Sequence, residues 1–364
     1  FTNKVTTLDT IENLKLSLKS GEIESPLNPD DFFPSTYKLG YAPDLMKFLN
    51  SADEEYWLLK KKNSNCGRGI TLIEDIKQYK DDLVTKEEAK KSEPEPEIDS
   101  AGTGSSTDIL LQKLKEMGIE DEAKTEETPE QTQNEVEENK EEQKEEQKEE
   151  PVATRKIKNA RSLTKELQNV IIQKYQAKPL LYNGKKFDIR CYSVISCTKP
   201  FVVLFNDGYC RISLNDFNLE DFNTKEGKIT HMTNNSVQKK HPEYKARKEE
   251  TIIDMTTLKE YLIENSKISS AEEFDLKVTA KIKEIMRIMF LQVKDKLDKT
   301  FGCFELLGWD FLLDEDLNPQ LIEININPAL FTDTSTQKKI IPKLIDDTVD
   351  ITLKLHARDR KSVV

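Results

Sequence analysis

The sequence predicts an α/β protein, and two kinds of pattern carry that prediction. Short apolar runs with the length and composition of strands recur along the chain, at residues 57–60, 169–175, 187–197, 200–206, 209–213, 301–313 and 321–326. Longer stretches with helical spacing follow some of these runs, at residues 258–265, 272–297 and 336–356. A chain of 364 residues with these elements is long enough to bury a sizeable core.

The predicted elements can be justified in chain order. Short segments over residues 31–60 lead to a strand that ends in a cation, Lys60. The helix predicted at 272–297 has an apolar face that repeats at helical spacing and belongs to the core, formed by Ile282, Ile285, Met286 and Met289. The last helix carries Pro342 near its first turn.

One turn is predicted from a dipeptide. An apolar run at residues 201–205 leads through Asn206, Asp207 and Gly208 to a second run at residues 209–211. Asp-Gly between two apolar runs is a signal for a hairpin turn, so we expect the chain to reverse there.

The acidic charge belongs to one segment of the chain. Residues 81–150 carry a net charge of −16 against −12 for the whole chain, so the remaining 294 residues carry +4. We expect residues 81–155 to be a mostly disordered insertion, because so few apolar side chains cannot offset the entropy of ordering. A short helix at residues 107–117 is the expected exception. The insertion is either a solvated segment or a regulatory one, as an autoinhibitory mimic of an acidic partner or as a site of self-modification.

The insertion divides the chain into three predicted regions. Residues 1–80 are expected to form the first part of a folded unit, residues 81–155 the insertion, and residues 156–364 the second part. The five cysteines form no CxxC pair, which argues against a zinc site and a disulfide framework. No run has the length of a membrane-spanning helix, and no secretory signal is visible. We therefore expect a cytoplasmic protein that binds no membrane.

Three polar side chains within apolar runs point to a metal site. Asp310 lies in the apolar run at residues 308–313, and Glu323 and Asn325 lie two residues apart in the next run. Residues i and i+2 of a strand face the same side, so Glu323 and Asn325 project together. Oxygen ligands of this kind suit Mg²⁺ that shares its shell with nucleotide phosphates. A solvated strand edge is the alternative.

Several cations are placed to accompany such a site. Lys186, Asp188 and Arg190 alternate along one strand and share a face. Upstream, Lys60 ends a strand and precedes a loop that contains Gly67, Arg68 and Gly69. Such a loop can bring backbone N–H groups and an arginine over phosphates.

An ordered set of motifs resembles the tubulin tyrosine ligase-like family of ATP-grasp amino-acid ligases. The matching blocks lie at residues 57–60, 67–70, 170–175, 178–181, 186–190, 231–236, 308–310 and 323–328. The resemblance covers roughly residues 30–80 and 165–355. Segments at residues 1–5 and 31–39 look most like the glycylase branch, and residues 197–201 and 327–330 like its polyglycylase subgroup. Lys61 and Met232 depart from the usual proline and leucine.

The resemblance implies an ATP-grasp fold that uses ATP and Mg²⁺ and preserves a set of functional residues. The implied metal ligands are Asp310, Glu323 and Asn325, and the implied catalytic residues are Arg190, Arg211 and Lys178. Loss of Asp310, Glu323 or Asn325 is expected to abolish transfer while leaving the fold largely intact. The nucleotide-binding residues would be Lys60, Gly67, Arg68, Gly69, Gln173, Lys174, Tyr175, Lys186, Asp188, His231, Thr233 and Asn234.

The family's reaction would activate a glutamate side chain of an acidic protein as an acylphosphate and join it to an amino acid. We expect glycine as the donor and tubulin, or another acidic protein, as the acceptor. Polyglutamylation with free glutamate is the alternative, and a catalytically weak nucleotide-binding interaction protein is an alternative of another class. We further expect a monomer in the cytoplasm, cytoskeleton and cilium that binds no nucleic acid. The family would place a further N-terminal lobe before Phe1.

Overall fold

The structure is a computed structural model that describes residues 4–51, 56–61, 69–91, 167–220 and 222–361. The chain divides into two units, of which one comprises residues 1–87 and 158–364. The other unit, residues 88–157, lies almost entirely outside the described residues, as does the short helix predicted at residues 107–117. The following description concerns the first unit.

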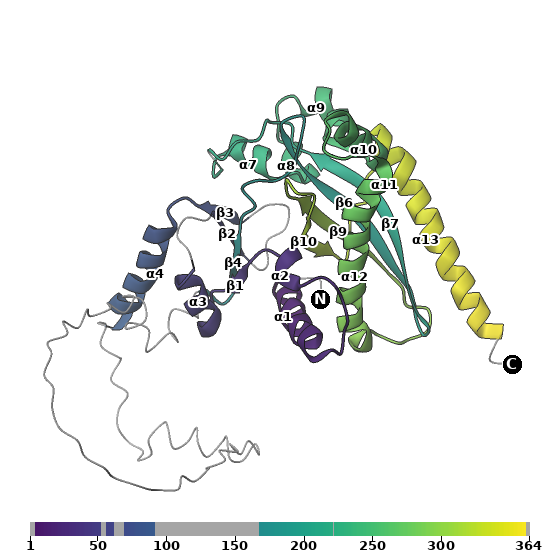
Figure 1. Cartoon of the computed structure of the whole chain (residues 1–364), viewed down its shortest axis with the longest axis horizontal. Coiled ribbons are helices and arrows are strands. Elements are labelled where there is room, and N and C mark those ends of the chain that lie inside the picture. The colour runs from purple at the N-terminus through teal and green to yellow at the C-terminus, as the bar shows by residue number, and fades with distance from the viewer. Residues whose placement is uncertain (1–3, 52–55, 62–68, 92–166, 221, 362–364) are drawn as a thin grey trace, which may run out of the picture. The chain divides into compact units, whose positions relative to one another are not determined.

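Two antiparallel sheets form the framework (Figure 1). The smaller sheet has the strand order β1 (Thr36–Lys38), β4 (Val170–Lys174), β2 (Trp57–Lys61) and β3 (Ile70–Ile73). The larger sheet has the order β10 (Pro319–Asn325), β9 (Glu305–Leu313), β6 (Lys185–Thr198), β7 (Phe201–Ile212) and β8 (Ile252–Asp254), and β5 (Leu181–Tyr182) pairs with β6. This mixed α/β architecture confirms the predicted class.

Helices cover both faces of the larger sheet (Figure 1). On one face α12 (Ala280–Val293) buries its apolar side against Ile189, Trp309 and Phe311, and α1 (Lys4–Ser20) packs beside it. On the other face α13 (Ser335–Lys361) packs Ile341 and Leu344 against strand residues. The helix predicted at residues 272–297 is confirmed as a succession of α11 (Ala271–Phe274), a π-helical segment (Asp275–Thr279), α12 and a short 3₁₀ turn (Lys294–Lys296).

Short helices complete the unit. Their bounds are α2 (Pro29–Phe32), α3 (Ala42–Leu49), α4 (Ile76–Lys91), α7 (Lys225–His231), α8 (Asn235–Gln238), α9 (Tyr244–Arg247), the 3₁₀ turn Lys248–Thr251 and α10 (Met255–Glu264). Asp254 caps α10, because its carboxylate accepts a hydrogen bond from the Thr257 backbone N–H at 2.8 Å. In the described parts of the chain, no helix has both the length and the apolar character needed to span a membrane.

Helix α4 extends into the predicted acidic insertion. Its residues 81–91 are helical, although the sequence analysis placed them in a mostly disordered segment. Residues 92–155 of the predicted insertion lie outside the described part of the chain.

The hairpin turn predicted at residues 206–208 is wrong. β7 continues through these residues, and the reversal occurs at Lys199 and Pro200, between Thr198 of β6 and Phe201 of β7. Asp207 and Gly208 instead form a bulge, because two residues of β7 lie opposite one residue of β6. Gly208 has φ +67°, and an added Cβ would lie 1.9 Å from the carbonyl oxygen of Arg190.

We expect Gly208→Ala to lower the free energy of unfolding by about 2–5 kcal/mol, because a left-handed conformation and a backbone clash both oppose the methyl group. Gly184→Ala is the matched control, since Gly184 has φ +73° but no atom within 4 Å of the added Cβ. Its cost should stay near 1 kcal/mol. Urea denaturation of both variants measures the difference, and equal losses would contradict the close packing on Arg190.

Candidate functional site

A cavity of about 180 Å³ collects side chains from both sheets and from the segment after α7. Twelve of the predicted site residues line it: Lys60, Gln173, Lys174, Tyr175, Lys186, Asp188, Arg211, His231, Thr233, Asn234, Asp310 and Glu323. Residues that are distant in the sequence are thus brought together around one space, as a ligand site requires.

Buried ion pairs form the most charged part of the site. Arg190 contacts Asp310 through Nε at 2.5 Å and Nη2 at 3.0 Å. Arg211 contacts both oxygens of Asp188, at 2.7 and 2.5 Å, and reaches Asp310 at 2.8 Å. All four side chains are buried. Burial alone would raise the pKa of Asp310, but the two guanidinium groups lower it to about 2.

Strand register explains how these residues meet. Asp188 of β6 lies opposite Arg211 of β7, and Arg190 lies opposite Asp310 of β9. Asp310 in turn lies opposite Glu323 of β10. Cross-strand neighbours are close enough for side chains to interact, so the register of four strands builds two adjacent rows of charges, Asp188 with Arg211 and Arg190 with Asp310 and Glu323.

A glycine makes room for the row that contains Arg190. Gly308 of β9 lies beside Arg190, where an added Cβ would be 3.4 Å from Cδ and 3.5 Å from Nε of Arg190. The same Cβ would be 2.8 Å from Cβ of Pro328, which is closer than real contacts allow. Gly308 therefore lets the segment after β10 pass close to the Arg190 side chain.

The smaller sheet contributes a second cation. Lys60 of β2 is buried and donates a hydrogen bond of 2.5 Å to Oε1 of Gln173, a residue of β4. The Gln173 amide donates in turn to Thr36 Oγ1 at 2.9 Å. These contacts hold the Lys60 side chain on the cavity side of the sheet.

Lys186 belongs to a second polar group in the cavity. Its Nζ donates to the Tyr175 hydroxyl at 3.0 Å, and that oxygen lies 2.7 Å from Nδ1 of His231. Burial, together with the charge of Lys60, lowers the pKa of Lys186 to about 7 although Asp188 acts in the opposite direction. Burial and the charge of Lys186 lower the pKa of His231 to about 4, so this imidazole is neutral at pH 7.

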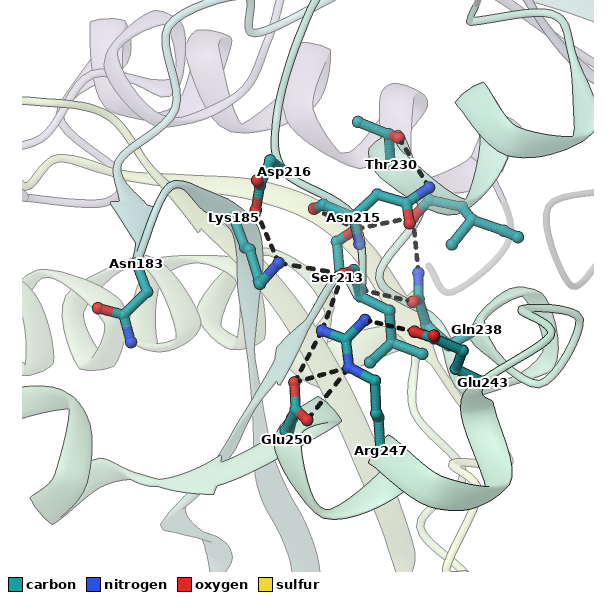
Figure 2. A network of polar contacts seen from close by, with 12 residues as sticks. Asn183, Lys185, Ser213, Asn215, Asp216, Thr230, Gln238, Glu243, Arg247 and Glu250 are labelled. Atoms are coloured by element: carbon teal, nitrogen blue, oxygen red, sulfur yellow. Dashed lines mark hydrogen bonds and ion pairs between the residues drawn. The ribbon is translucent and has the colours of Figure 1, made fainter.

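A network around Gln238 holds the segment at residues 231–234 in place (Figure 2). The Gln238 side chain is fully buried and accepts a hydrogen bond from the Leu214 backbone N–H at 2.9 Å. Its amide donates to the carbonyl oxygens of Ile229 and Met232, each at 2.7 Å. These carbonyls lie at the end of α7, where helical partners are lacking. Gln238 thus joins the end of β7 to the segment that carries His231, Thr233 and Asn234.

The three predicted metal ligands lie close together. Asn325 Nδ2 is 3.5 Å from Asp310 Oδ2, and Glu323 lines the same cavity. Among the described residues, no hydrogen bond or ion pair occupies the Glu323 carboxylate, and no cluster of three or more His, Cys, Asp or Glu side chains is placed to hold a metal. Two carboxylates and an amide fit Mg²⁺, because this ion is commonly bound by one or two carboxylates, with waters and phosphates completing its shell.

Other predicted residues lie elsewhere. Lys178 is exposed and does not line the cavity. Gly69 has φ +72° just before β3 and is also absent from the lining, while Gly67 and Arg68 lie outside the described residues. Arg190 reaches the site through Asp310.

Sequence reasoning missed most of the apolar lining. This part of the wall includes Leu58, Ile70, Ile171, Phe222, Leu312 and Ile322. Three of them could have been found from the two-residue period of a strand, because Leu58, Ile171 and Leu312 each lie two positions from a predicted site residue. Phe222 lies in a loop, where no such period applies.

The fold and the cavity define a mixed α/β protein of antiparallel sheets with a cation-rich cavity. The chain belongs to the tubulin-tyrosine ligase family, because the sequence model of that family matches residues 3–361. The resemblance drawn from the sequence motifs is thereby confirmed, and the ATP-grasp-like class comes with the family.

Named relatives refine the comparison. The chain is 31% identical over 332 residues to "Protein polyglycylase TTLL10" of Rattus norvegicus, covering 90% of this chain and 39% of that protein. It is 27% identical to "Inactive polyglycylase TTLL10" of Homo sapiens, over 90% of this chain and 39% of that protein. It is 31% identical over 188 residues to "Probable tubulin polyglutamylase TTLL2" of Mus musculus, over 50% and 33% of the two chains. The chain thus spans about two fifths of the length of its first relatives.

Proposed function

We propose that the protein is an ATP-dependent ligase that joins glycine to glutamate side chains of tubulin or another acidic protein. The observation that carries the proposal is the buried charge cluster of the cavity. Among the described residues, the cationic side chains of Lys186, Arg190 and Arg211 are buried together with two carboxylates, Asp188 and Asp310, and Lys60 lines the same cavity. Buried charge of one sign is costly unless a partner balances it, and the phosphates of ATP would do so.

The cluster also suits the reaction. An anionic carboxylate must approach an anionic phosphoryl group, so the site has to stabilise negative charge that develops between them. Arg211 and Lys186 line the cavity and would face that charge, and Arg190 is fixed behind them by Asp310. Asp310, Glu323 and Asn325 would hold Mg²⁺, which supplies further positive charge to the phosphates.

The choice of glycine and of tubulin rests on the names of relatives. Proteins named as polyglycylases align with 90% of this chain, whereas the relatives named as probable polyglutamylases align with about half of it. Polyglutamylation is the second candidate, because it would use the same cluster with a different amino acid. A weakly catalytic nucleotide-binding role is the third, since one relative is named inactive.

The proposal is tested by measuring ADP release from ATP with the acceptor and the amino acid supplied separately and together. We expect ADP to form at an appreciable rate only when an acidic acceptor such as tubulin and glycine are both present. ADP release with the acceptor and glutamate alone would favour the polyglutamylase. Tight ATP binding without ADP release under any of these conditions would contradict ligase activity.

The pKa of Lys186 predicts proton uptake when ATP binds. Without ligand this pKa is about 7, and nearby phosphates would raise it because they favour the charged form. Binding above pH 7 should therefore take up as much as about one proton, and the affinity should fall as the pH rises through this range. Calorimetry in buffers of different ionisation enthalpy measures the uptake. Lys186→Met should remove it, and unchanged uptake in that variant would assign the proton to another group.

A further inference from the structure

We propose that Tyr175 and His231 form a positioning pair for Lys186, in which His231 is fixed as the neutral tautomer that carries its proton on Nε2. In this arrangement His231 Nδ1 accepts a hydrogen bond from the Tyr175 hydroxyl. The hydroxyl oxygen in turn accepts a hydrogen bond from the Lys186 ammonium. The sequence analysis assigned His231 to the nucleotide lining, whereas the geometry assigns it a role that acts through Tyr175. The link to ATP binding rests on the proposed function.

The direction of each hydrogen bond follows from donor and acceptor counts. The Lys186 ammonium has only donors, so at 3.0 Å it must donate to the Tyr175 oxygen. A tyrosine hydroxyl has a single proton, and the 2.7 Å contact with His231 Nδ1 is the place where it is used. Nδ1 is therefore the acceptor, which leaves the imidazole proton on Nε2.

The three side chains lie in buried surroundings, where His231 Nε2 has no hydrogen-bond partner among the described residues. Lys186, Tyr175 and His231 are only 4%, 6% and 5% exposed. The Lys186 Nζ lies 4.4 Å from the centre of the Tyr175 ring, so the ring face as well as the hydroxyl favours the charged lysine. Phe222 lies 4.5 Å from the His231 ring and 5.7 Å from the Tyr175 ring, measured between ring centres. Among the described residues, His231 and Lys186 are the recorded hydrogen-bond partners of the Tyr175 hydroxyl.

Such a pair would matter for binding because lysine is flexible. A free lysine side chain loses rotamer entropy when it is held against a ligand, and a side chain that is already held loses less. Lys186 lines the cavity beside Asp188 and in the field of Lys60. Tyr175 from the end of β4 and His231 from the end of α7 would hold the Lys186 ammonium there before a phosphate arrives.

The first test uses no nucleotide and is independent of the proposed function. The chain has three histidines, so long-range ¹H–¹⁵N spectra of the imidazole rings can be assigned by substituting His241 and His356 singly. We expect His231 at pH 7 to be neutral with its proton on Nε2 and with Nδ1 accepting a hydrogen bond. Tyr175→Phe should shift the Nδ1 signal toward that of an unbonded nitrogen. A wild-type His231 with its proton on Nδ1, or a charged ring, would overturn the proposal.

The second test is a double-mutant cycle on binding of Mg²⁺-ATP. Tyr175→Phe should weaken binding by about ten- to a hundredfold, the effect of one hydrogen bond to a charged group. The double variant Tyr175→Phe, Lys186→Met should bind no more weakly than Lys186→Met, because Tyr175 acts through that lysine. Losses that multiply in the double variant would indicate a separate, structural role for Tyr175 and contradict the pair.

Two comparisons sharpen this cycle. His231→Gln keeps a side-chain acceptor for the Tyr175 hydroxyl and should bind ATP better than His231→Phe. Tyr261→Phe is the matched control, because its hydroxyl accepts a 2.9 Å hydrogen bond from Asn183 N–H away from the cavity lining. It should retain wild-type ATP affinity and unchanged His231 signals. If His231→Gln and His231→Phe lose the same ATP affinity, the hydrogen bond that His231 accepts from the Tyr175 hydroxyl is not its contribution to binding.

Discussion

Asp310→Ala is expected to lower the free energy of unfolding by about 3–5 kcal/mol and to abolish ligation. The Asp310 carboxylate is 5% exposed and binds both Arg190 and Arg211. Its removal leaves two buried guanidinium groups that, among the described residues, keep Asp188 as their one ion-pair partner. The sequence alone predicts that such variants spare the fold, because Asp310 appears there as a metal ligand only. Urea denaturation without nucleotide or metal measures the loss.

The matched control for this variant is Asp316→Ala, in the exposed turn that follows the same strand. Its effect should stay within about 0.5 kcal/mol. If Asp310→Ala is as stable as this control, water or other groups replace the carboxylate. That result would contradict a structural role for the buried cluster.

Glu323→Gln is expected to reduce ligation by about 100-fold or more while leaving the stability within about 0.5 kcal/mol. The Glu323 carboxylate is half-buried in the cavity, and among the described residues it has no hydrogen-bond or ion-pair partner. Glutamine keeps its shape and removes only the charge that would balance Mg²⁺. Initial rates over a range of Mg²⁺ concentrations, together with the melting temperature, separate these effects.

Glu315→Gln in the turn between β9 and β10 is the control for this second variant, since Glu315 is exposed and is not among the residues that line the cavity. It should ligate at the wild-type rate. Wild-type ligation by Glu323→Gln would instead remove Glu323 from the catalytic site, and a large loss of stability would assign it a structural role.

These two variants differ for a reason that the sequence could not reveal. Asp310, Glu323 and Asn325 were identified from their positions in apolar runs, and the proximity of Glu323 to Asn325 was predicted from the two-residue period of a strand. The pairing of Asp310 with Arg190 and Arg211 depends on the register of β6, β7 and β9. The paired residues of β6 and β9 are more than a hundred positions apart in the sequence. Local patterns contain no information on such register.

The same limit explains the misplaced turn. Asp207-Gly208 is a sound local signal for a conformation with positive φ, and Gly208 does adopt one. Whether that conformation makes a turn or a bulge depends on whether the partner strand continues, and β6 continues past it. Strand positions, the 272–297 helix and its core face were predictable because each follows from a period along the chain itself.

The contacts of His231 are a further case. Its place in the site could be expected from the motif at residues 231–236, but its partner Tyr175 lies 56 positions earlier. A hydrogen bond across that separation requires the whole fold.

The central claim is that this cluster serves the ligation of glycine to glutamate side chains, and mass spectrometry of tubulin tests it most directly. Tubulin would be incubated with the protein, Mg²⁺-ATP and an equal mixture of glycine and glutamate, with Glu323→Gln in parallel. The account predicts that tail peptides gain glycine residues on glutamate side chains, and that the Glu323→Gln sample lacks them. Addition of glutamate alone would contradict the choice of donor, and equal addition by both proteins would contradict the site.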